Sequence, residues 1–304
     1  MNIRFDDKVV LITGVAPHGL GAAYAELLAD RGTTLVLNDL GVDWSGESTP
    51  PGAEIVARQI SEAGGSASAV GGDVSEDAQR IVAETVERHG RIDALINNAG
   101  AGGDFDTMLR VHVKGTHQMS EAAWPWLQKA GAGRIINTAS NATWGSGSNG
   151  RPGYATAKSA VIALTRVQAR NGQADGIASN VVLPSAWTNS TAGMPDPAVR
   201  GFLERHFAAE HIAGFVAYLA HESATVTGMA FSAGGGVVAR VVQAKTHGHL
   251  SLEASPEVWA EHIDEVTEIG DLLVPPSMWG DVGMLARRIG PEVAGEFETL
   301  DLPI

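Results

Sequence analysis

The residues best suited to chemistry in this sequence are Ser140, Tyr154 and Lys158. Tyr154 and Lys158 are four residues apart, and this spacing places two side chains on the same face of a helix. An ammonium group beside a phenol favours the phenolate and lowers a pKa that is ordinarily about 10. We therefore predict Tyr154 as a general acid/base, Lys158 as the group that tunes it, and Ser140 as a hydrogen-bonding partner of the substrate oxygen.

A second group of residues could hold a nucleotide. Gly14, Gly19 and Gly21 lie between an apolar run at residues 8–14 and a helical pattern at residues 19–31. Glycines in such a turn let backbone amides and a helix N-terminus come close to a pyrophosphate. A glycine triplet alone is a weak signal, so its weight depends on the residues further along the chain.

Asp39 lies 18 residues after Gly21, at the end of the next apolar run. A carboxylate at this place binds the ribose hydroxyls of NAD and repels the 2′-phosphate of NADP. The alternative interpretation of Asp39 is a turn residue before Gly41. The pattern predicts NAD as the cofactor.

The elements that must position these residues alternate along the chain. Buried apolar runs take turns with helical patterns, which predicts an α/β fold with a doubly wound, mainly parallel sheet and helices on both faces. Strands are expected at 8–14, 33–39, 66–71, 92–96, 133–139, 177–183 and 229–232, and helices at 19–31, 53–63, 76–89, 107–129, 154–171 and 210–221. Ligands of such sheets bind at the carboxyl ends of the strands, where Gly14, Asp39 and Ser140 fall.

The composition changes after about Lys245, where an acidic stretch begins. We predict a catalytic domain at residues 1–245 and a short C-terminal appendage at 246–304, with helices at about 256–269 and 280–289. The appendage is expected to pack on the domain or on a neighbouring subunit.

Composition excludes several classes of protein. The 304 residues include no cysteine, which removes disulfides, cysteine-zinc sites and thiol nucleophiles, and the net charge of −14 argues against nucleic-acid binding. Neither a signal peptide, a membrane-spanning run nor a peroxisomal C-terminal tripeptide is seen, so a cytoplasmic protein without membrane partners is expected. No metal is predicted, because His206 and His211 lack zinc-helix spacing and His247 and His249 are interpreted as solvated or structural.

The motifs together resemble the short-chain dehydrogenase/reductase superfamily over roughly residues 5–240. The matching motifs are Thr13-Gly14 with Gly19-Leu20-Gly21, then Asn97-Asn98-Ala99-Gly100, Ser140, and Tyr154 with Lys158. A narrower likeness, to the (3R)-hydroxyacyl-CoA dehydrogenase domain of D-bifunctional enzymes and bacterial single-domain relatives, is carried by residues 38–43, 110–115, 122–124 and 220–223.

The resemblance implies a seven-stranded Rossmann sheet and an oxidoreductase that moves a hydride between a secondary alcohol and the nicotinamide of NAD. It implies a cofactor site formed by Gly14, Gly19, Leu20, Gly21, Asp39, Asp73, Val74, Asn98, Ala99, Gly100, Tyr154, Lys158, Pro184 and Thr188. It also implies a substrate lid at about 185–206, which Gly193, Met194, Pro195 and Pro197 suggest is not helical. Relatives of this kind assemble as homodimers or homotetramers.

The sequence departs from the family pattern at four places. The turn from Gly14 to Gly19 is one residue longer than usual and contains Pro17, and the interval from Ser140 to Tyr154 is also one longer. His112 stands where most members carry an asparagine of a proton relay, and its alternative role is that of a packed helix residue. Only eleven residues separate Gly100 from His112, so the start of that helix is shortened.

Two alternatives to this enzyme come from other functional classes. A non-catalytic NAD(H)-binding sensor or scaffold would fit the altered glycine turn, but it would not need a tuned phenol. A serine hydrolase would need a Gly-x-Ser-x-Gly elbow, which Ser140 lacks. The substrate stays open between a hydroxyacyl-CoA, which Arg151, Arg200 or Arg205 could bind, and a steroid-like alcohol, which Trp144, Trp187, Met194 or Phe202 could contact.

Overall fold

The computed structural model describes residues 3–302 apart from 146–151, 193, 195 and 254. The chain divides into two compact units, Met1–Arg240 and Val241–Ile304. This division lies five residues before the boundary expected from composition. None of the helices described combines the length and the apolarity needed to cross a bilayer.

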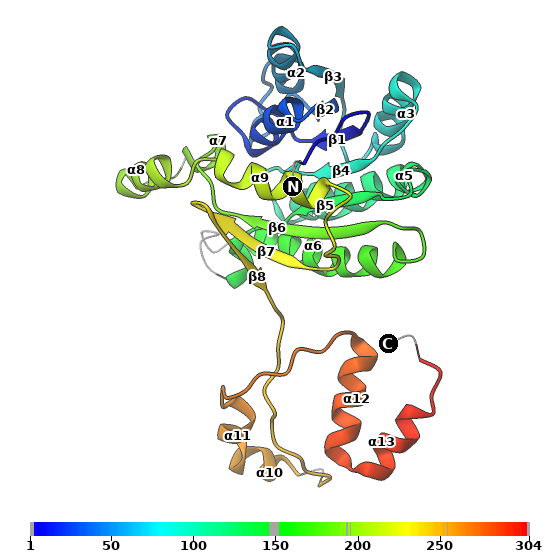
Figure 1. Ribbon diagram of the computed structural model, residues 1–304. Helices are drawn as coiled ribbons and strands as arrows, with labels where there is room; N and C mark the ends of the chain where they lie inside the picture. Colours follow the sequence, from blue (N-terminus) through cyan, green and yellow to red (C-terminus); the bar gives the residue numbers. More distant parts are fainter. Residues whose placement is uncertain (1–2, 146–151, 193, 195, 254, 303–304) are drawn as a thin grey trace. The chain divides into compact units, whose positions relative to one another are not determined.

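The first unit contains an eight-stranded sheet with the order β3-β2-β1-β4-β5-β6-β7-β8 (Figure 1). Its strands are β1 (Val9–Thr13), β2 (Thr34–Asp39), β3 (Ser66–Gly71), β4 (Ala94–Asn97), β5 (Arg134–Thr138), β6 (Ala178–Pro184), β7 (Ala230–Gly234) and β8 (Val237–Val241). Strands β1 to β7 pair in parallel. Strand order reverses between β1 and β4, and ligands of open parallel sheets bind at such a point.

Strand β8 is one more than the seven that the resemblance implied. It follows β7 after only Gly235 and Gly236, which both have positive φ. A two-residue connection of this conformation returns the chain beside the strand that it leaves. The paired glycines were the sequence signal for this hairpin, which was not predicted.

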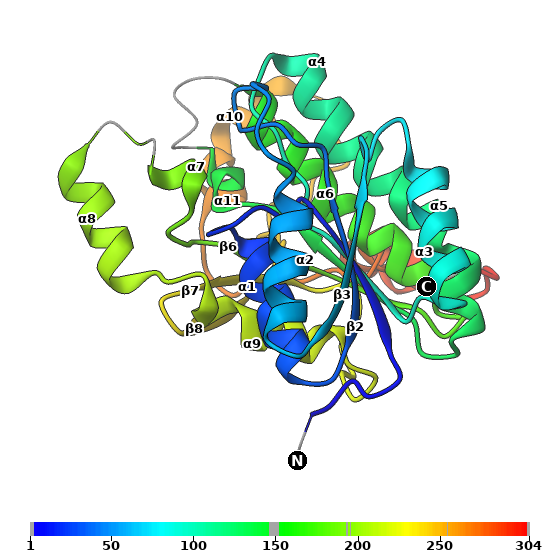
Figure 2. The ribbon, with the colours of Figure 1, turned by 90° about the horizontal axis from the view of Figure 1, so that it is seen from above.

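Helices cover both faces of the sheet (Figure 2). One layer is α1 (Leu20–Asp30), α2 (Gly52–Glu62) and α9 (Glu210–Ala220), and the other is α3 (Ala78–His89), α5 (Thr116–Lys129) and α6 (Pro152–Asn171). All five residues of β1 are buried because each face is covered: Val10 and Ile12 join the core with α1 and α9, and Val9 and Leu11 join the core with α3 and α5. This explains why the strand is apolar throughout.

The helix expected at 107–129 is divided into three parts. A short helix α4 (Phe105–Met108) leads into a π-helical segment η1 (Leu109–Gly115), and α5 follows. A Cβ at Gly115 would lie 2.6 Å from Cγ2 of Val74, so the segment comes too close to the loop after β3 for a side chain there. π-helical turns are frequent at functional sites, and this one carries His112.

The prediction that the 185–206 segment is not helical was wrong. It contains α7 (Asn189–Ala192) and α8 (Pro197–His206). Asp196 caps α8 by accepting hydrogen bonds from the amides of Ala198 and Val199, and Pro197 occupies the first turn, where proline is well tolerated. The aspartate-proline pair was therefore a helix start signal. Gly193 and Pro195 lie outside the described residues.

The second unit contains helices α10 (Pro256–Glu261), α11 (Ile263–Thr267), α12 (Met278–Ile289) and α13 (Pro291–Glu298). The first two replace the single helix expected at 256–269. Among the described residues of this unit, only Gly283 and Ala286 are buried. The unit therefore lacks a core comparable with the two that flank the sheet.

Candidate active site

Ser140 and Tyr154 meet at the carboxyl edge of β5. Ser140 lies two residues beyond the strand in extended backbone, and its Oγ accepts a hydrogen bond from the amide of Ala142 at 3.1 Å. Tyr154 is in the first turn of α6, and its phenol hydrogen bonds with the Ser140 hydroxyl. The structure thus brings the two predicted groups into contact although they are fourteen positions apart in the sequence.

Lys158 lies one helical turn after Tyr154. Its Nζ is 5.8 Å from the centre of the Tyr154 ring and donates a hydrogen bond of 2.7 Å to the carbonyl oxygen of Thr138, at the end of β5. The residue is only 4% exposed, and this burial lowers the pKa of the Lys158 ammonium to about 7. The group is therefore close to half protonated at neutral pH.

The lowered phenol pKa that the spacing predicted is not seen. Burial raises the pKa of Tyr154, and the hydrogen bond with Ser140 opposes this only in part. The reason is that the i,i+4 spacing accounts for the neighbouring cation but not for the removal of water around both groups. In the chain without ligands, Tyr154 is a protonated phenol, which suits it to donate a proton.

His112 lies beside Tyr154 and is almost completely buried. Their ring centres are 5.4 Å apart with the rings edge to face. The Nε2 atom of His112 is 2.9 Å from the carbonyl oxygen of Ala101, while Nδ1 is buried without a partner among the described residues. Burial, reinforced by the charge of Lys158, lowers the pKa of His112 to about 3, so the imidazole is neutral at physiological pH.

Trp44 is a site residue that was not predicted from the sequence. It comes from the loop after β2, and its ring centre is 5.8 Å from that of Tyr154 and 6.2 Å from that of His112. Its carbonyl oxygen accepts a hydrogen bond of 3.0 Å from the amide of Gly102. The available signal was its place five residues after Asp39, at the carboxyl edge of the sheet where the other site residues gather.

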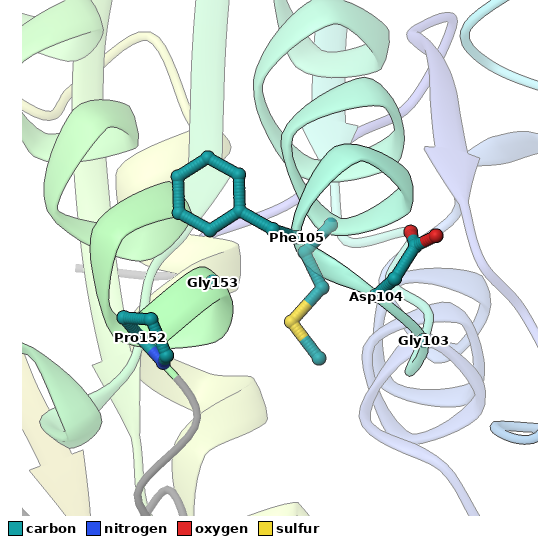
Figure 3. A pocket seen from close by; sticks show the side chains of 6 residues that line it. Gly103, Asp104, Phe105, Pro152 and Gly153 are labelled. Atoms are coloured by element: carbon teal, nitrogen blue, oxygen red, sulfur yellow. The ribbon is translucent and has the colours of Figure 1, made fainter.

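A hollow of about 360 Å³ opens between α4 and the start of α6 (Figure 3). It is lined by Gly103, Asp104, Phe105, Met108, Pro152 and Gly153. Phe105 from α4 faces the start of α6 across this space. The shortened segment between Gly100 and His112 supplies most of the lining, so the departure from the family pattern shapes this hollow.

The glycine turn packs too closely against neighbouring backbone to leave space for side chains at Gly14 and Gly21. Gly14 has φ +68°, and a Cβ there would lie 2.5 Å from Cα of Ala99. A Cβ at Gly21 would lie 2.8 Å from the carbonyl oxygen of Gly14, which also accepts a 2.8 Å hydrogen bond from Nδ2 of Asn98. Gly19 is the N-cap residue of α1 and has no side chain to bond the first amides of the helix. These amides, from Leu20 onward, therefore face the turn.

The extra residue of this turn is accommodated at His18. Its φ is +59°, a conformation that residues other than glycine rarely adopt. The amide of Gly19 donates to the carbonyl oxygen of Ala16 at 3.1 Å and closes the turn. Nδ2 of Asn189, in α7, donates to the carbonyl oxygen of Pro17 at 2.9 Å, so the longer turn is tied to the segment after β6.

Asp39 ends β2 beside this turn. Its Oδ2 accepts a 3.2 Å hydrogen bond from the amide of Gly52, at the start of α2. Burial raises the pKa of Asp39, and hydrogen bonds from backbone amides oppose the shift. Gly52 was not singled out from the sequence, yet a Cβ there would lie 2.9 Å from Cα of Ala16, so α2 closes on the turn only with glycine at this position.

Other predicted cofactor residues are engaged within the protein. The Asp73 carboxylate accepts hydrogen bonds from Ser75 and from Nη1 of Arg110 at 2.7 Å, and Val74 packs against Gly115. Pro184 ends β6 at the carboxyl edge, and the amide of Thr188 donates to Oγ1 of Thr191 at 2.7 Å. Asp73, Val74 and Thr188 thus contact other residues of the protein, and Pro184 lies at the carboxyl edge of the sheet.

Two further motifs have structural roles. Nδ2 of Asn141, the residue after Ser140, donates to Oγ of Ser185 at 2.7 Å. The buried guanidinium of Arg134 donates to the carbonyl oxygens of His221 and Glu222 at 3.2 and 2.8 Å. The 220–223 motif therefore anchors the loop after α9 to the start of β5.

Comparison with known proteins agrees with this architecture. Residues 8–195 match the short chain dehydrogenase family. The chain is 34% identical to the peroxisomal hydratase-dehydrogenase-epimerase of Neurospora crassa over 97% of its own length and 34% of that protein, and 34% identical to the peroxisomal multifunctional enzyme A of Dictyostelium discoideum over 97% of its own length and 68% of that protein.

A solved structure of the full-length peroxisomal multifunctional enzyme type 2 from Drosophila melanogaster superposes with a TM-score of 0.77 and 27% identity. The alignment covers 97% of this chain and 50% of that protein. The chain thus spans about a third of the Neurospora protein and half of the Drosophila one, and its likeness is to part of each.

Dehydrogenases of this family bind a nicotinamide cofactor and oxidise CH-OH groups or reduce the corresponding carbonyl groups. The family match covers more than half of the chain and includes the glycine turn and the helix with Tyr154 and Lys158. The chain as a whole resembles the dehydrogenase part of the multifunctional enzymes. The chain belongs to the short-chain dehydrogenase/reductase family and is an oxidoreductase that acts on CH-OH groups.

Proposed function

We propose that this protein is an NAD-dependent dehydrogenase of a hydroxyacyl-CoA or of a steroid-like secondary alcohol, with Ser140, Tyr154 and Lys158 as its catalytic residues. The observation that carries the proposal is the hydrogen bond between Ser140 and Tyr154 with Lys158 buried 5.8 Å from the phenol ring. The apolar side chains of Phe105 and Met108 line the hollow at the start of α6 and favour a substrate with a hydrocarbon part.

The residues of the glycine turn fit a dinucleotide. Glycine at positions 14 and 21 lets the turn pack closely against Ala99 and against itself, and the first amides of α1 are suited to a pyrophosphate. Asp39 ends β2, where its carboxylate would bind the adenosine ribose and favour NAD over NADP. When bound, NAD(H) accepts or supplies the hydride.

The protein's own groups handle the proton. In the direction of ketone reduction the Tyr154 phenol donates its proton to the substrate oxygen, and the Ser140 hydroxyl orients that oxygen by hydrogen bonding. The Lys158 ammonium stabilises the phenolate left behind, since an opposite charge close by favours the ionised form. Neutral His112 offers its unpartnered Nδ1 as a hydrogen-bond acceptor next to the phenol ring.

The decisive experiment compares the wild type with Tyr154→Phe on a panel of 3-hydroxyacyl-CoA esters, hydroxysteroids and simple secondary alcohols. With NAD we expect turnover of at least one class and a loss of kcat of about 10³-fold in the variant, within the range for a positioned acid/base. The wild type should have a lower kcat/KM with NADP than with NAD. Asp39→Ser should reduce this difference, because it removes the carboxylate that repels the 2′-phosphate.

Tyr218→Phe serves as the matched control, because Tyr218 lies on α9, outside the site, and packs against Phe215. Binding of NAD without turnover of any panel member would instead favour the sensor or scaffold. Equal activity of the wild type and Tyr154→Phe would overturn the catalytic assignment.

A further inference from the structure

The C-terminal unit contains a cluster of histidine and carboxylate side chains that the dehydrogenase chemistry does not use. His249 lies in the segment after β8, His262 lies between α10 and α11, and Glu265 is in α11. The Nδ1 atoms of both histidines lie 2.9 Å from Glu265, His249 from Oε2 and His262 from Oε1. One carboxylate thus holds two imidazoles by the same ring atom.

The two imidazole rings are stacked face to face. Their centres are 3.7 Å apart and their planes differ by 8°, and Trp259 packs edge to face against His249. Both Nδ1 atoms lie 2.9 Å from the same carboxylate, so one potential ligand atom of each residue lies close to the other two. These three atoms all lie within 4.8 Å of one another.

We propose that His249, His262 and Glu265 form a binding site for a divalent transition metal ion of the zinc class. Two imidazole nitrogens and one carboxylate oxygen are ligands that zinc prefers, at about 2.0–2.2 Å. Binding would require the stacked rings to rotate until both Nδ1 lone pairs point at the ion. Each histidine would bind through the Nδ1 lone pair and keep its proton on Nε2. The fourth position is left to water, because all three residues are partly exposed.

Because this unit is weakly packed, a bound metal ion would stabilise its fold. Small units that bury little apolar surface depend on staples such as metal ions. Here the ion would join the segment after β8 to the α10–α11 region, 13 to 16 residues further along the chain. A hydrogen bond of 2.8 Å from Oγ1 of Thr246 to the carbonyl oxygen of Val266 already brings these two segments together.

The test is a Zn²⁺ titration of the full chain without an affinity tag, by calorimetry and by the thermal midpoint. We expect one equivalent of Zn²⁺ per chain, a higher midpoint that a chelator reverses, and a loss of affinity of at least about 100-fold in His249→Ala and His262→Ala. Co²⁺ should give the visible absorption of a tetrahedral site in the wild type alone.

The matched controls are His247→Ala and Asp264→Asn, which change exposed neighbours outside the cluster and should leave Zn²⁺ binding unchanged. His262→Gln, which keeps a polar side chain, replaces His262→Ala if circular dichroism shows that the alanine variant is unfolded. Equal Zn²⁺ binding by the wild type and by the His249→Ala, His262→Ala double variant overturns the proposal. So does a wild type that binds none, which would leave a hydrogen-bonded cluster only.

Discussion

Histidines in the two units of this protein experience opposite environments. His112 is enclosed at the edge of the sheet, and burial lowers its pKa to about 3. His249 and His262 lie in a unit with almost no buried side chains among its described residues, and each keeps a nitrogen directed at the Glu265 carboxylate. The same residue type is thus a neutral, oriented group in one unit and a candidate metal ligand in the other.

The difference follows from how much apolar surface each unit buries. The sheet unit has two cores, one on each face, whereas the C-terminal unit leaves Leu252 and Ile269 more than 80% exposed. A buried charge loses its hydration and its pKa moves, whereas an exposed charge keeps its water. Tuned acid/base groups are therefore expected only in the first unit.

The largest expected effect comes from replacing the buried cation of the sheet unit. Lys158→Met should lower kcat by about 10³-fold, because the phenolate of Tyr154 loses its neighbouring charge. The same change should stabilise the chain at pH 6 by about 1–3 kcal/mol, since a desolvated ammonium is removed. Kinetics and denaturant unfolding measure the two effects.

The pH dependence of this stabilisation has a defined sign. The pKa of Lys158 is about 7 when folded, below its unfolded value, so between pH 7 and about 10.4 only the unfolded chain holds the proton. The unfolding free energy contributed by this group therefore rises with pH in that window. The advantage of Lys158→Met should shrink from pH 7 upward, while Lys129→Met, at an exposed site, should show no such trend. A constant difference would contradict the burial argument.

A second comparison uses the same substitution in both units. Leu28 in α1 is completely buried, whereas Leu285 in α12 is 51% exposed. Leu28→Ala should lower the unfolding free energy by about 2–5 kcal/mol, the cost of a core cavity, and Leu285→Ala should cost under about 1 kcal/mol. Thermal and denaturant unfolding compare them. Equal losses would show that Leu285 is covered in the assembled protein.

The smallest effect concerns His112, which acts as a neutral acceptor in our proposal. His112→Leu should lower kcat by about 10-fold or more, because a hydrogen-bonding group next to Tyr154 is lost. His112→Asn, which restores the residue of most family members, should keep most of the activity. Neither variant should change the shape of the pH–rate profile between pH 5 and 9, because His112 does not titrate there. A profile that changes would assign His112 a proton-carrying role.

Much of the fold and part of the site could be predicted from local patterns. Apolar runs that end in Gly14, Asp39 or Ser140 identify buried strands and place polar residues at their carboxyl ends, because burial on both faces demands apolar residues throughout. The helical pattern around Tyr154 and Lys158 predicted that their side chains lie on the same face of a helix. The short helices α7 and α8 were missed because glycine and proline were taken as breakers, although Asp196 and Pro197 form a start signal.

By itself, the sequence determined the alternation of the seven parallel strands with the helices that cover them, the edge of the sheet at which the candidate site residues gather, and the family to which the chain belongs. Only the tertiary structure decided the environment of each group, because burial depends on residues distant in sequence. It decided that Tyr154 is a protonated phenol, that Trp44 joins the site, and that His249, His262 and Glu265 converge. Spacing along the chain carries no record of such long-range contacts or of the water that they exclude.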